Sequence, residues 1–339
     1  MKSVYVKRRL LKVNGAYAKG EFLIPLVTYE KGISPGVNRG IKAVNACGGV
    51  DVRILKDEMT RAPGFKFNSM DEGLRFYNYI DKNKEKLTEI AESTTHYGKV
   101  TSIQPKLVGS HIFLRLGMFT GDAAGHNMTT KAAHAVSEYL SQQFPKIKYV
   151  SVSSNYCVDK KVSAINPLQG RGKEVFACVN APSSICQDIL KTQPEDLVEV
   201  YNTKTLGSIV AGSLCSNNTH HSNIFKAIYE ATGQDTANII ESSQGITYAE
   251  LRGENLFFSV SLPCVIVGTV GGGTSEKAPR KALEQLGCYG SGRPVGFNSK
   301  KLAEIVGAAV LAAEFNLDAA HTNPKEFVYT SLLLERGQA

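Results

Sequence analysis

The stretch VTSIQPKLVGSHIFLRLGM, residues 100–118, predicts two strands joined by a tight turn. Val100–Lys106 and His111–Met118 are rich in the β-branched and apolar residues that favour strands, and a Val-Gly-Ser turn lies between them. The stretch therefore predicts a strand-turn-strand unit.

The segments on both sides of this hairpin extend the pattern. A short strand at 65–67 and a helix from Asp71 to about Ser93, with apolar residues at helical spacing, precede it. A helix from about Ala124 to Phe144 and a strand at Tyr149–Ser153 follow it. The order β-α-β-β-α-β is that of the ferredoxin-like, or split βαβ, arrangement.

The rest of the chain has a different character, with Gly-rich turns, a strand at Val175–Val179, and helices near Asn223–Thr232 and Ser299–Glu314. We therefore expect an α+β protein in which a small ferredoxin-like domain, residues 64–153, interrupts a larger domain made of residues 1–63 and 154–339.

The amino-acid composition narrows the class of protein to which the chain can belong. The 339 residues are 42% hydrophobic, which is enough for a large core or two domains. The seven cysteines are scattered without metal-ligand spacing, so we expect a reducing compartment, no disulfide framework and no metal. The apolar runs are shorter than the about 20 residues of a membrane span, so we expect a cytoplasmic protein without membrane contact.

The net charge is +8, but lysine and arginine are dispersed rather than clustered. This dispersion argues against nucleic acid as a partner. A phosphate-rich small ligand fits the charge better, and an ordinary basic surface accounts for most of it.

Two glycine-rich segments are compatible with a phosphate-bearing ligand. GDAAGHNM, residues 121–128, joins a strand to a helix, where free backbone N–H groups can hold phosphate. GTVGGGT, residues 268–274, follows an apolar strand and allows close approach of a backbone or a ligand. A plain strand-to-helix turn explains the first equally well, and a tight chain crossing explains the second.

Charged and polar turns give two further candidates. DKK, residues 159–161, places two lysines beside an aspartate, next to a segment that is expected to be buried. A lysine in a water-poor pocket stabilises a developing oxyanion, whereas the alternative is a surface turn with an ordinary ion pair. NNTHHSN, residues 217–223, begins a helix and is either a site or a solvated turn; its adjacent histidines diverge and form no metal motif.

Several segments together, in this order and with these gaps, resemble the hydroxymethylglutaryl-coenzyme A reductase family over roughly Gly15 to Leu317. The segments that carry the resemblance are TYEKGISPGVNRG (28–40), DEMTRAP (57–63), GDAAGHNM (121–128), SSNYCVDKKVSAIN (153–166), GRGK (170–173), NTHHSN (218–223), GQD (233–235) and GTVGGGT (268–274).

The resemblance implies reduction of 3-hydroxy-3-methylglutaryl-CoA to mevalonate and CoA, by two hydride transfers from NADPH or NADH, with NADPH favoured. It identifies Lys160 as the buried cation at the reacting oxygen, Glu30 as a protonated acid and Asp235 as the carboxylate that links them. His220 is the fourth catalytic residue. The family's two-subunit site implies a homodimer or a higher homo-oligomer.

The resemblance also implies that the small domain binds the nucleotide and the large domain binds the substrate and coenzyme A. It further implies binding residues for each part of the ligands. Those for the substrate are Arg61, Ser153, Lys161, Lys204 and Asn223, and Arg39 contacts coenzyme A. Those for the cofactor are Asp122, Gly125, Asn127, His96, Gly271 and Gly272.

The sequence departs from the family pattern at several positions. His96 stands where NADPH-preferring members carry an arginine, and Ala124 and His126 replace methionines. About Thr330 falls where the family has a histidine that protonates the coenzyme A thiolate. These departures leave two alternatives open: a divergent reductase of another acyl thioester or of the aldehyde, and a catalytically degenerate homologue that binds CoA or nucleotide.

Overall fold

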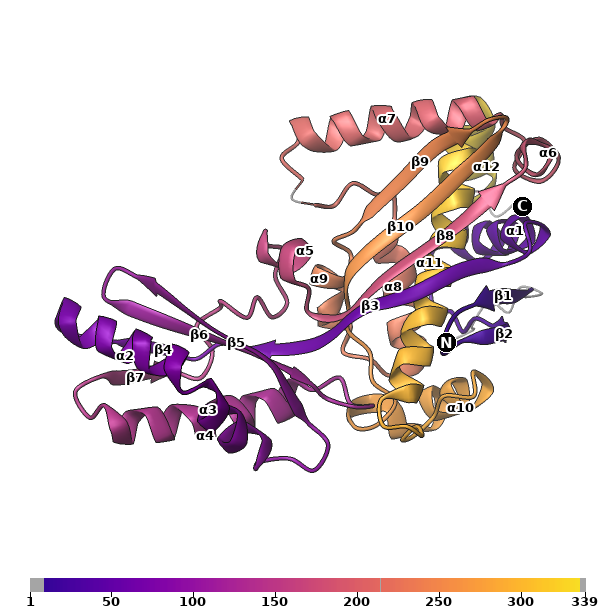
Figure 1. Cartoon of the computed structure of the whole chain (residues 1–339). Helices are drawn as coiled ribbons and strands as arrows, with labels where there is room; N and C mark the ends of the chain where they lie inside the picture. The colour runs from indigo at the N-terminus through magenta and orange to yellow at the C-terminus, as the bar shows by residue number, and fades with distance from the viewer. Residues whose placement is uncertain (1–8, 214, 336–339) are drawn as a thin grey trace.

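The computed structural model describes residues 9–213 and 215–335 and has an α+β fold. Its described strands form a 10-stranded sheet whose main path runs β7-β4-β6-β3-β8-β10-β9, with β5 paired to β6 and the β1–β2 hairpin joined to β3. This sheet passes through a large unit and a small unit, and Figure 1 shows the small unit extending to the lower left.

The large unit holds the longer strands and most helices. Its strands are β1 (Leu10–Asn14), β2 (Lys19–Leu23), β3 (Val50–Arg61), β8 (Gly172–Ala181), β9 (Ile246–Arg252) and β10 (Asn255–Val265). Its helices are α1 (Ile33–Ala46), α5 (Ile165–Gln169), α6 (Ser183–Ile185), α7 (Pro194–Val210), α8 (His221–Thr232), α9 (Ile239–Ser242), α10 (Lys277–Gln285), α11 (Phe297–His321) and α12 (Pro324–Glu335). Short 3₁₀ turns lie at Thr236–Asn238 and Gly272–Ser275, and a π turn at Cys186–Leu190.

Helix α11 forms the centre of the larger core. Nearly all of its side chains from Leu302 to Phe315 are buried, because alanines and β-branched residues occupy every face. It packs on α1, where Gly40 permits a close contact: a Cβ there would lie 1.8 Å from the carbonyl oxygen of Ala312. The helix therefore connects the sheet on one side to α1 on the other.

The small unit confirms the β-α-β-β-α-β order that the sequence predicts. Its elements are β4 (Gly64–Lys66), α2 (Met70–Lys82), α3 (Lys84–Glu92), β5 (Lys99–Val108), β6 (His111–Phe119), α4 (His126–Gln143) and β7 (Lys148–Ser151). The strands lie in the antiparallel order β7-β4-β6-β5. A separate hydrophobic core, which includes Phe76, Leu116 and Val136, lies between this sheet and its helices.

One sequence prediction in this unit is wrong. The single helix expected from Asp71 to about Ser93 is two helices that meet at Asn83. The Asn83 side chain donates a hydrogen bond to the carbonyl oxygen of Tyr79 at 2.7 Å, and its backbone leaves the helical region at φ −116°. Asparagine competes in this way for backbone partners and so favours the end of a helix.

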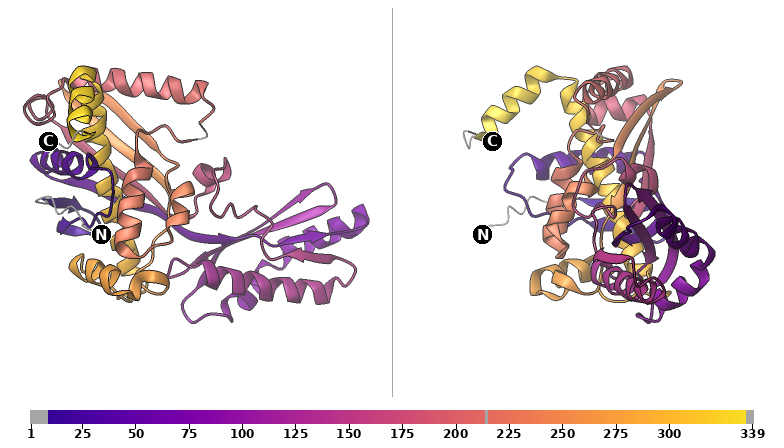
Figure 2. Two further views of the ribbon diagram at one scale, coloured as in Figure 1. Left: turned by 180° about the vertical axis from the view of Figure 1, so that it is seen from behind. Right: turned by 90° about the vertical axis from the view of Figure 1, so that its left-hand side faces the viewer.

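Strand β3 joins the two units. Residues Asp51–Glu58 pair with β8 in the large unit, and Met59–Arg61 pair with β6 in the small unit. The left-hand view of Figure 2 shows this strand crossing from one unit to the other without a break. The boundaries at 63/64 and 153/154 stay a prediction, and residues 1–8, 214 and 336–339 of the predicted large domain lie outside the described residues.

Candidate functional site

Four segments that are distant in the sequence meet where the small unit joins the large one. The turn before α4 lies against the glycine-rich turn after β10, since Ala123 forms a parallel bridge with Val270. The end of α8 meets the same glycine-rich turn, where a Cβ at Gly233 would lie 2.4 Å from the carbonyl oxygen of Gly273. The fourth segment is the loop that carries DKK, which is linked to Asp235 by an ion pair.

Lys160 and Asp235 form this ion pair, with 2.9 Å between Nζ and Oδ2. The hydrogen bond to Asp235 raises the pKa of Lys160. Burial opposes a lower pKa at Asp235, but the hydrogen bond and charge of Lys160, together with the backbone N–H of Ala237, outweigh it and lower that pKa. Both groups are therefore charged at neutral pH. The expectation of a buried ammonium is wrong, because the side chains are 36% and 45% exposed.

The backbone of the loop that carries Lys160 is strained. Asn155, Val158 and Lys160 all have positive φ angles, of 66°, 54° and 56°. Such conformations are costly for residues other than glycine and concentrate at functional sites. The backbone N–H of Lys160 donates to Glu241 Oε1 at 3.0 Å, which helps to hold this conformation.

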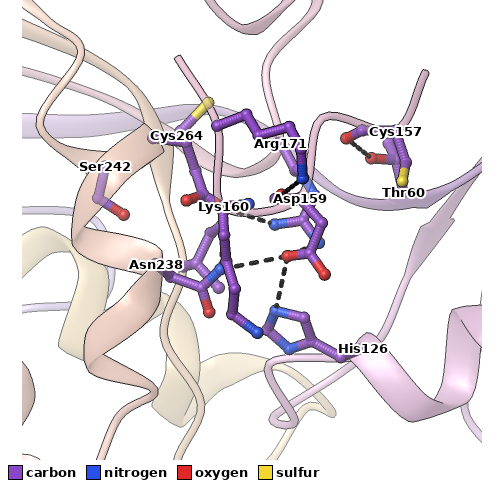
Figure 3. Close-up of polar contacts among 12 residues, drawn as sticks. Thr60, His126, Cys157, Asp159, Lys160, Arg171, Asn238, Ser242 and Cys264 are labelled. Carbon is purple, nitrogen blue, oxygen red and sulfur yellow. Dashed lines mark hydrogen bonds and ion pairs between the residues drawn. The ribbon is translucent and has the colours of Figure 1, made fainter. Parts of the chain in front are cut away.

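Asp159 lies in a network of charged and polar groups (Figure 3). Its Oδ1 is 3.0 Å from Arg171 Nη2 and accepts from Asn238 Nδ2 at 3.4 Å. Arg171 is fully buried and also binds Glu241 at 2.8 Å. Burial opposes ionisation of Asp159, yet Arg171 and the neighbouring cations lower its pKa. The network fixes the base of the loop on α9.

Arg61 and Ser153 lie on the other side of Asp159. Arg61 Nη1 is 3.7 Å from Asp159 Oδ2 and donates to Ser153 Oγ at 3.4 Å. Lys161 is exposed and donates to the backbone carbonyl of Asp159, at 3.0 Å. The structure thus brings together five residues that the resemblance assigns to one site: Arg61, Ser153, Lys160, Lys161 and Asp235.

His126, the first residue of α4, reaches into this cluster from the small unit. Its Nε2 is 3.7 Å from Asp159 Oδ1, and its side chain is 20% exposed. Burial, with the nearby charge of Arg171, lowers the pKa of His126 to about 4. The imidazole is therefore neutral at pH 7.

The residues expected to hold the cofactor lie around the same junction. Gly271 and Gly272 have φ angles of 76° and 55°, and apart from their chain neighbours no described heavy atom lies within 4 Å of where a Cβ would be. Gly125, with φ 96°, precedes α4, and Asn127 is exposed in its first turn. His96 is exposed in the turn between α3 and β5. The open glycines and the start of α4 fit a phosphate-bearing or amide-bearing ligand.

Asp122 was also expected to contact the cofactor, but its carboxylate is bound within the protein. Its carboxylate accepts hydrogen bonds from the backbone N–H groups of Gly292, Gly296 and Ser299, each at 2.9 Å. These groups lie at and before the first turn of α11, where N–H groups lack helical partners. Asp122 thus joins the glycine turn to α11, and its side-chain oxygens are engaged within the protein.

A cavity of about 710 Å³ lies at a second place, between α1, the start of α8, α11 and α12. Its lining includes Glu30, Arg39, His220 and Asn223. Neither Lys160 nor Asp235 lines it. Glu30 is exposed, so the expected burial of its carboxyl beside Lys160 does not occur within one chain.

The turn that carries His220 is held by buried acids of α11. Glu314 accepts from the backbone N–H groups of Thr219 and His220, the latter at 3.1 Å, and from Thr247 Oγ1 at 2.9 Å. Burial opposes ionisation of Glu314, but His221 and His220 lower its pKa. This fixes the position of the His220 ring at the cavity.

Lys204 lies beneath the same turn. Its Nζ is 2.5 Å from Asp318 Oδ1 and donates to Thr219 Oγ1 at 2.6 Å. Burial and the charge of Glu314 raise the pKa of Asp318 to about 6. The lysine predicted to bind substrate is thus paired with an acid of the chain.

The last helix brings no histidine to the cavity. Thr330 and Ser331 of α12 line it, and the sequence PKEFVYTSLLLE of this helix contains no histidine. His321 precedes α12 and packs edge-on against Phe327 at 4.7 Å. Burial lowers the pKa of His321 to about 4.

Sequence reasoning missed the groups that position the site. They are Arg171, Asn238, Glu241, Glu314 and Asp318. Arg171 lies in the quoted GRGK segment, which was the available signal. Glu314 and Asp318 lie in α11, whose apolar pattern predicts only packing, and Asn238 and Glu241 lie in turns too short to have a periodic pattern.

Neither a metal-binding cluster nor a membrane-spanning helix occurs among the described residues. No group of three or more His, Cys, Asp or Glu side chains there is arranged to hold a metal ion. No helix in that part of the chain is both long and apolar enough to span a membrane.

Comparison with known proteins shows the family to which the chain belongs. The family model described as hydroxymethylglutaryl-coenzyme A reductase matches residues 9–325. The 3-hydroxy-3-methylglutaryl-coenzyme A reductase of Methanocaldococcus jannaschii is 45% identical over 313 residues, 91% of this chain and 76% of that protein. The enzyme of the same name from Aeropyrum pernix is 43% identical over 312 residues, 91% of this chain and 74% of that protein.

A solved structure gives the same fold. The class II 3-hydroxy-3-methylglutaryl-CoA reductase from Streptococcus pneumoniae, bound to NADPH, superposes with a TM-score of 0.73 at 18% identity, over 95% of this chain and 88% of that one. The likeness confirms the predicted α+β fold with its inserted small unit. With the family model matching nearly its whole length, the chain belongs to the hydroxymethylglutaryl-coenzyme A reductase family.

Proposed function

We propose that this chain reduces 3-hydroxy-3-methylglutaryl-CoA to mevalonate and coenzyme A, with two hydrides from a nicotinamide cofactor. The family match over residues 9–325 and relatives of the same name at 45% identity support this activity. The observation that carries it is the Lys160–Asp235 pair, 2.9 Å long, at the place where the glycine-rich turns meet.

Lys160 stabilises the oxygen on which negative charge develops. When hydride adds to a carbonyl carbon, the electron pair of the C=O bond moves to oxygen, and a fixed ammonium lowers the energy of that state. Asp235 raises the pKa of Lys160 and so keeps it charged. The strained backbone at Lys160 and its bond to Glu241 hold the ammonium in place before substrate arrives.

Arg61 and its neighbours bind the free carboxylate of the substrate. A guanidinium is suited to two-point binding of a carboxylate, and Arg61 has a buried Nε without a hydrogen-bond partner among the described residues. Ser153 and Lys161 add donors on the same side of Asp159. Lys204 and Asn223 serve the substrate from the cavity side, where Lys204 must exchange Asp318 for the ligand.

The nicotinamide cofactor, which supplies hydride when bound, is held by the start of α4 and the facing glycine turn. Gly125, Asn127, Gly271 and Gly272 contribute backbone and amide groups, and Asp122 positions them through α11. His96, which is exposed on the small unit, contacts the outer end of the cofactor. NADPH is the proposed choice over NADH, and the structural relative from Streptococcus pneumoniae is described as bound to NADPH.

Glu30, His220 and Arg39 complete the site from the cavity, Arg39 by contacting coenzyme A. Because Lys160 and Asp235 do not line that cavity within one chain, we propose a homodimer or higher homo-oligomer in which a second copy brings the two groups together. Light scattering tests this: a monomer at the concentration of the activity assay, with full activity, contradicts a composite site.

The activity is tested with purified protein by following nicotinamide absorbance with NADPH and, separately, NADH. The thioester and mevaldehyde are offered in parallel. Oxidation of the cofactor with both substrates supports the proposal, and absence of oxidation with either substrate contradicts it.

A second candidate is a reductase that acts on the aldehyde alone. It is favoured by α12, which brings Thr330 rather than a histidine to the cavity and so offers no imidazole to the leaving thiolate. Turnover of mevaldehyde without turnover of the thioester in the same assay favours this candidate.

A further inference from the structure

His126 is the one imidazole of the small unit that enters the Lys160 cluster. It is the first residue of the 18-residue helix α4, so the fold fixes its Cα at the junction. Figure 3 shows its ring beside the end of the Lys160 side chain, on the side of Asp159. The charges of Lys160, Asp159 and Asp235 all act on it, so it shares their site.

The His126 ring has an unmet hydrogen-bonding group. Nε2 is buried and has no hydrogen-bond partner among the described residues. Asp159 Oδ1 is 3.7 Å away, too far for a hydrogen bond, and is already 3.0 Å from Arg171 Nη2. Buried polar atoms are nearly always paired, so an orphan of this kind in a ligand site indicates a ligand contact.

The neutral state of the His126 ring suits it to donate a hydrogen bond beside Lys160. Around it lie the cations Arg171 and Lys160 and the anions Asp159 and Asp235, and burial with Arg171 holds the pKa of His126 near 4. A neutral imidazole donates an N–H without adding a second positive charge beside Lys160. A neutral histidine can polarise a carbonyl in this way.

We propose that His126 is a second oxyanion-stabilising residue, whose ring N–H hydrogen-bonds the same substrate oxygen as Lys160. The inference rests on the proposed function. As hydride adds to the carbonyl carbon, the C=O electron pair moves to oxygen, and Lys160 and His126 both contact that oxygen. His126 keeps its proton throughout, and the contact is stronger to the oxyanion than to the ground-state carbonyl.

The test compares three single variants with the wild-type chain. His126→Met removes the N–H at similar size, His126→Gln keeps a donor, and His134→Met is the matched control. His134 lies two turns further along α4, where it contacts the exposed Glu138 carboxylate and the Tyr149 hydroxyl, each at 3.4 Å. We measure kcat and KM for mevaldehyde and for the thioester, and circular dichroism checks folding.

We expect His126→Met to lower kcat about 10²-fold with little change in KM, since one oxyanion donor contributes about 10²- to 10³-fold. His126→Gln should recover part of this loss, and His134→Met should match the wild type. Equal kcat for His126→Met and His134→Met overturns the inference, and so does a loss confined to KM. A wild-type chain without turnover overturns the proposed function and this inference together, whereas an active His126→Met overturns the inference alone.

A second measurement needs no variant. The imidazole ¹⁵N signals of His126 are followed in the wild-type protein while 3-hydroxy-3-methylglutaryl-CoA is added without cofactor. We expect the signal of the protonated nitrogen to move as it bonds to the thioester oxygen. An unchanged signal at saturation overturns the inference even if the Met variant does not fold.

Discussion

Replacing Arg171 with methionine tests whether the buried network holds the Lys160 loop. The guanidinium is fully buried, 3.0 Å from Asp159 and 2.8 Å from Glu241, so its removal leaves two carboxylates without their main cation. Breaking a buried pair by removing one partner costs about 3–5 kcal/mol. We expect the free energy of unfolding of Arg171→Met to fall by about that amount, from a total of about 5–15 kcal/mol for an ordinary domain.

The loss should also depend on pH. Burial already raises the pKa of Glu241, and without Arg171 it rises further. A carboxyl whose folded pKa lies above its unfolded value gives its stabilisation at low pH and loses it as pH rises. The free energy of unfolding of Arg171→Met should therefore lie further below that of the wild type at pH 8 than at pH 5.

Urea unfolding at both pH values measures the loss, and turnover is measured on the same samples. Arg280→Met is the matched control, because Arg280 pairs with Glu284 in an exposed i,i+4 bridge at 2.8 Å and should leave stability unchanged. A loss below about 1 kcal/mol at pH 8, with normal turnover, refutes the view that Arg171 supports the loop.

Three further predictions follow from the site. Lys160→Ala should abolish turnover and leave the urea midpoint unchanged, because the side chain is 36% exposed; surviving turnover excludes Lys160 as the oxyanion partner. Asp122→Ala should lower the free energy of unfolding by about 2 kcal/mol, because the contacts of the carboxylate with α11 are lost. Asp122→Asn should lose less, and equal urea midpoints for Asp122→Ala and the wild type count against this anchor. Burial lowers the pKa of His221 from 6.5 to about 4, so the unfolded chain takes up a proton at a higher pH than the folded chain. Tm should therefore fall as pH drops from 6.5 towards 4. A Tm that does not change over this range, or an equal fall in His221→Phe, contradicts this.

The fold of the small unit was predictable because its pattern is local. The hairpin at residues 100–118 and the helical spacing around it specify β-α-β-β-α-β without long-range information. The break at Asn83 depends on one side-chain bond to Tyr79, and β3 alternates poorly because it changes neighbours along its length. Neither feature has a clear periodic signature.

The site was predictable only in part. The resemblance led to Lys160 and Asp235, and the structure places them in contact. Their exposure could not be predicted, since it depends on how four distant segments meet. Arg171 and Glu314 were missed because their roles depend on burial against partners that lie 70 and 95 residues away in the sequence. Asp122 fits a ligand contact by its turn, yet its oxygens bind α11.

The continuity of β3 has a consequence for how the protein melts. One strand contributes hydrogen bonds to the part of the sheet in each unit, so the small core cannot open without disturbing the end of the strand that the large core holds. Amide protons of Met59–Arg61 should therefore exchange with deuterium at the rate set by the whole molecule. In a calorimeter, two cores linked in this way give a single heat-absorption peak rather than two.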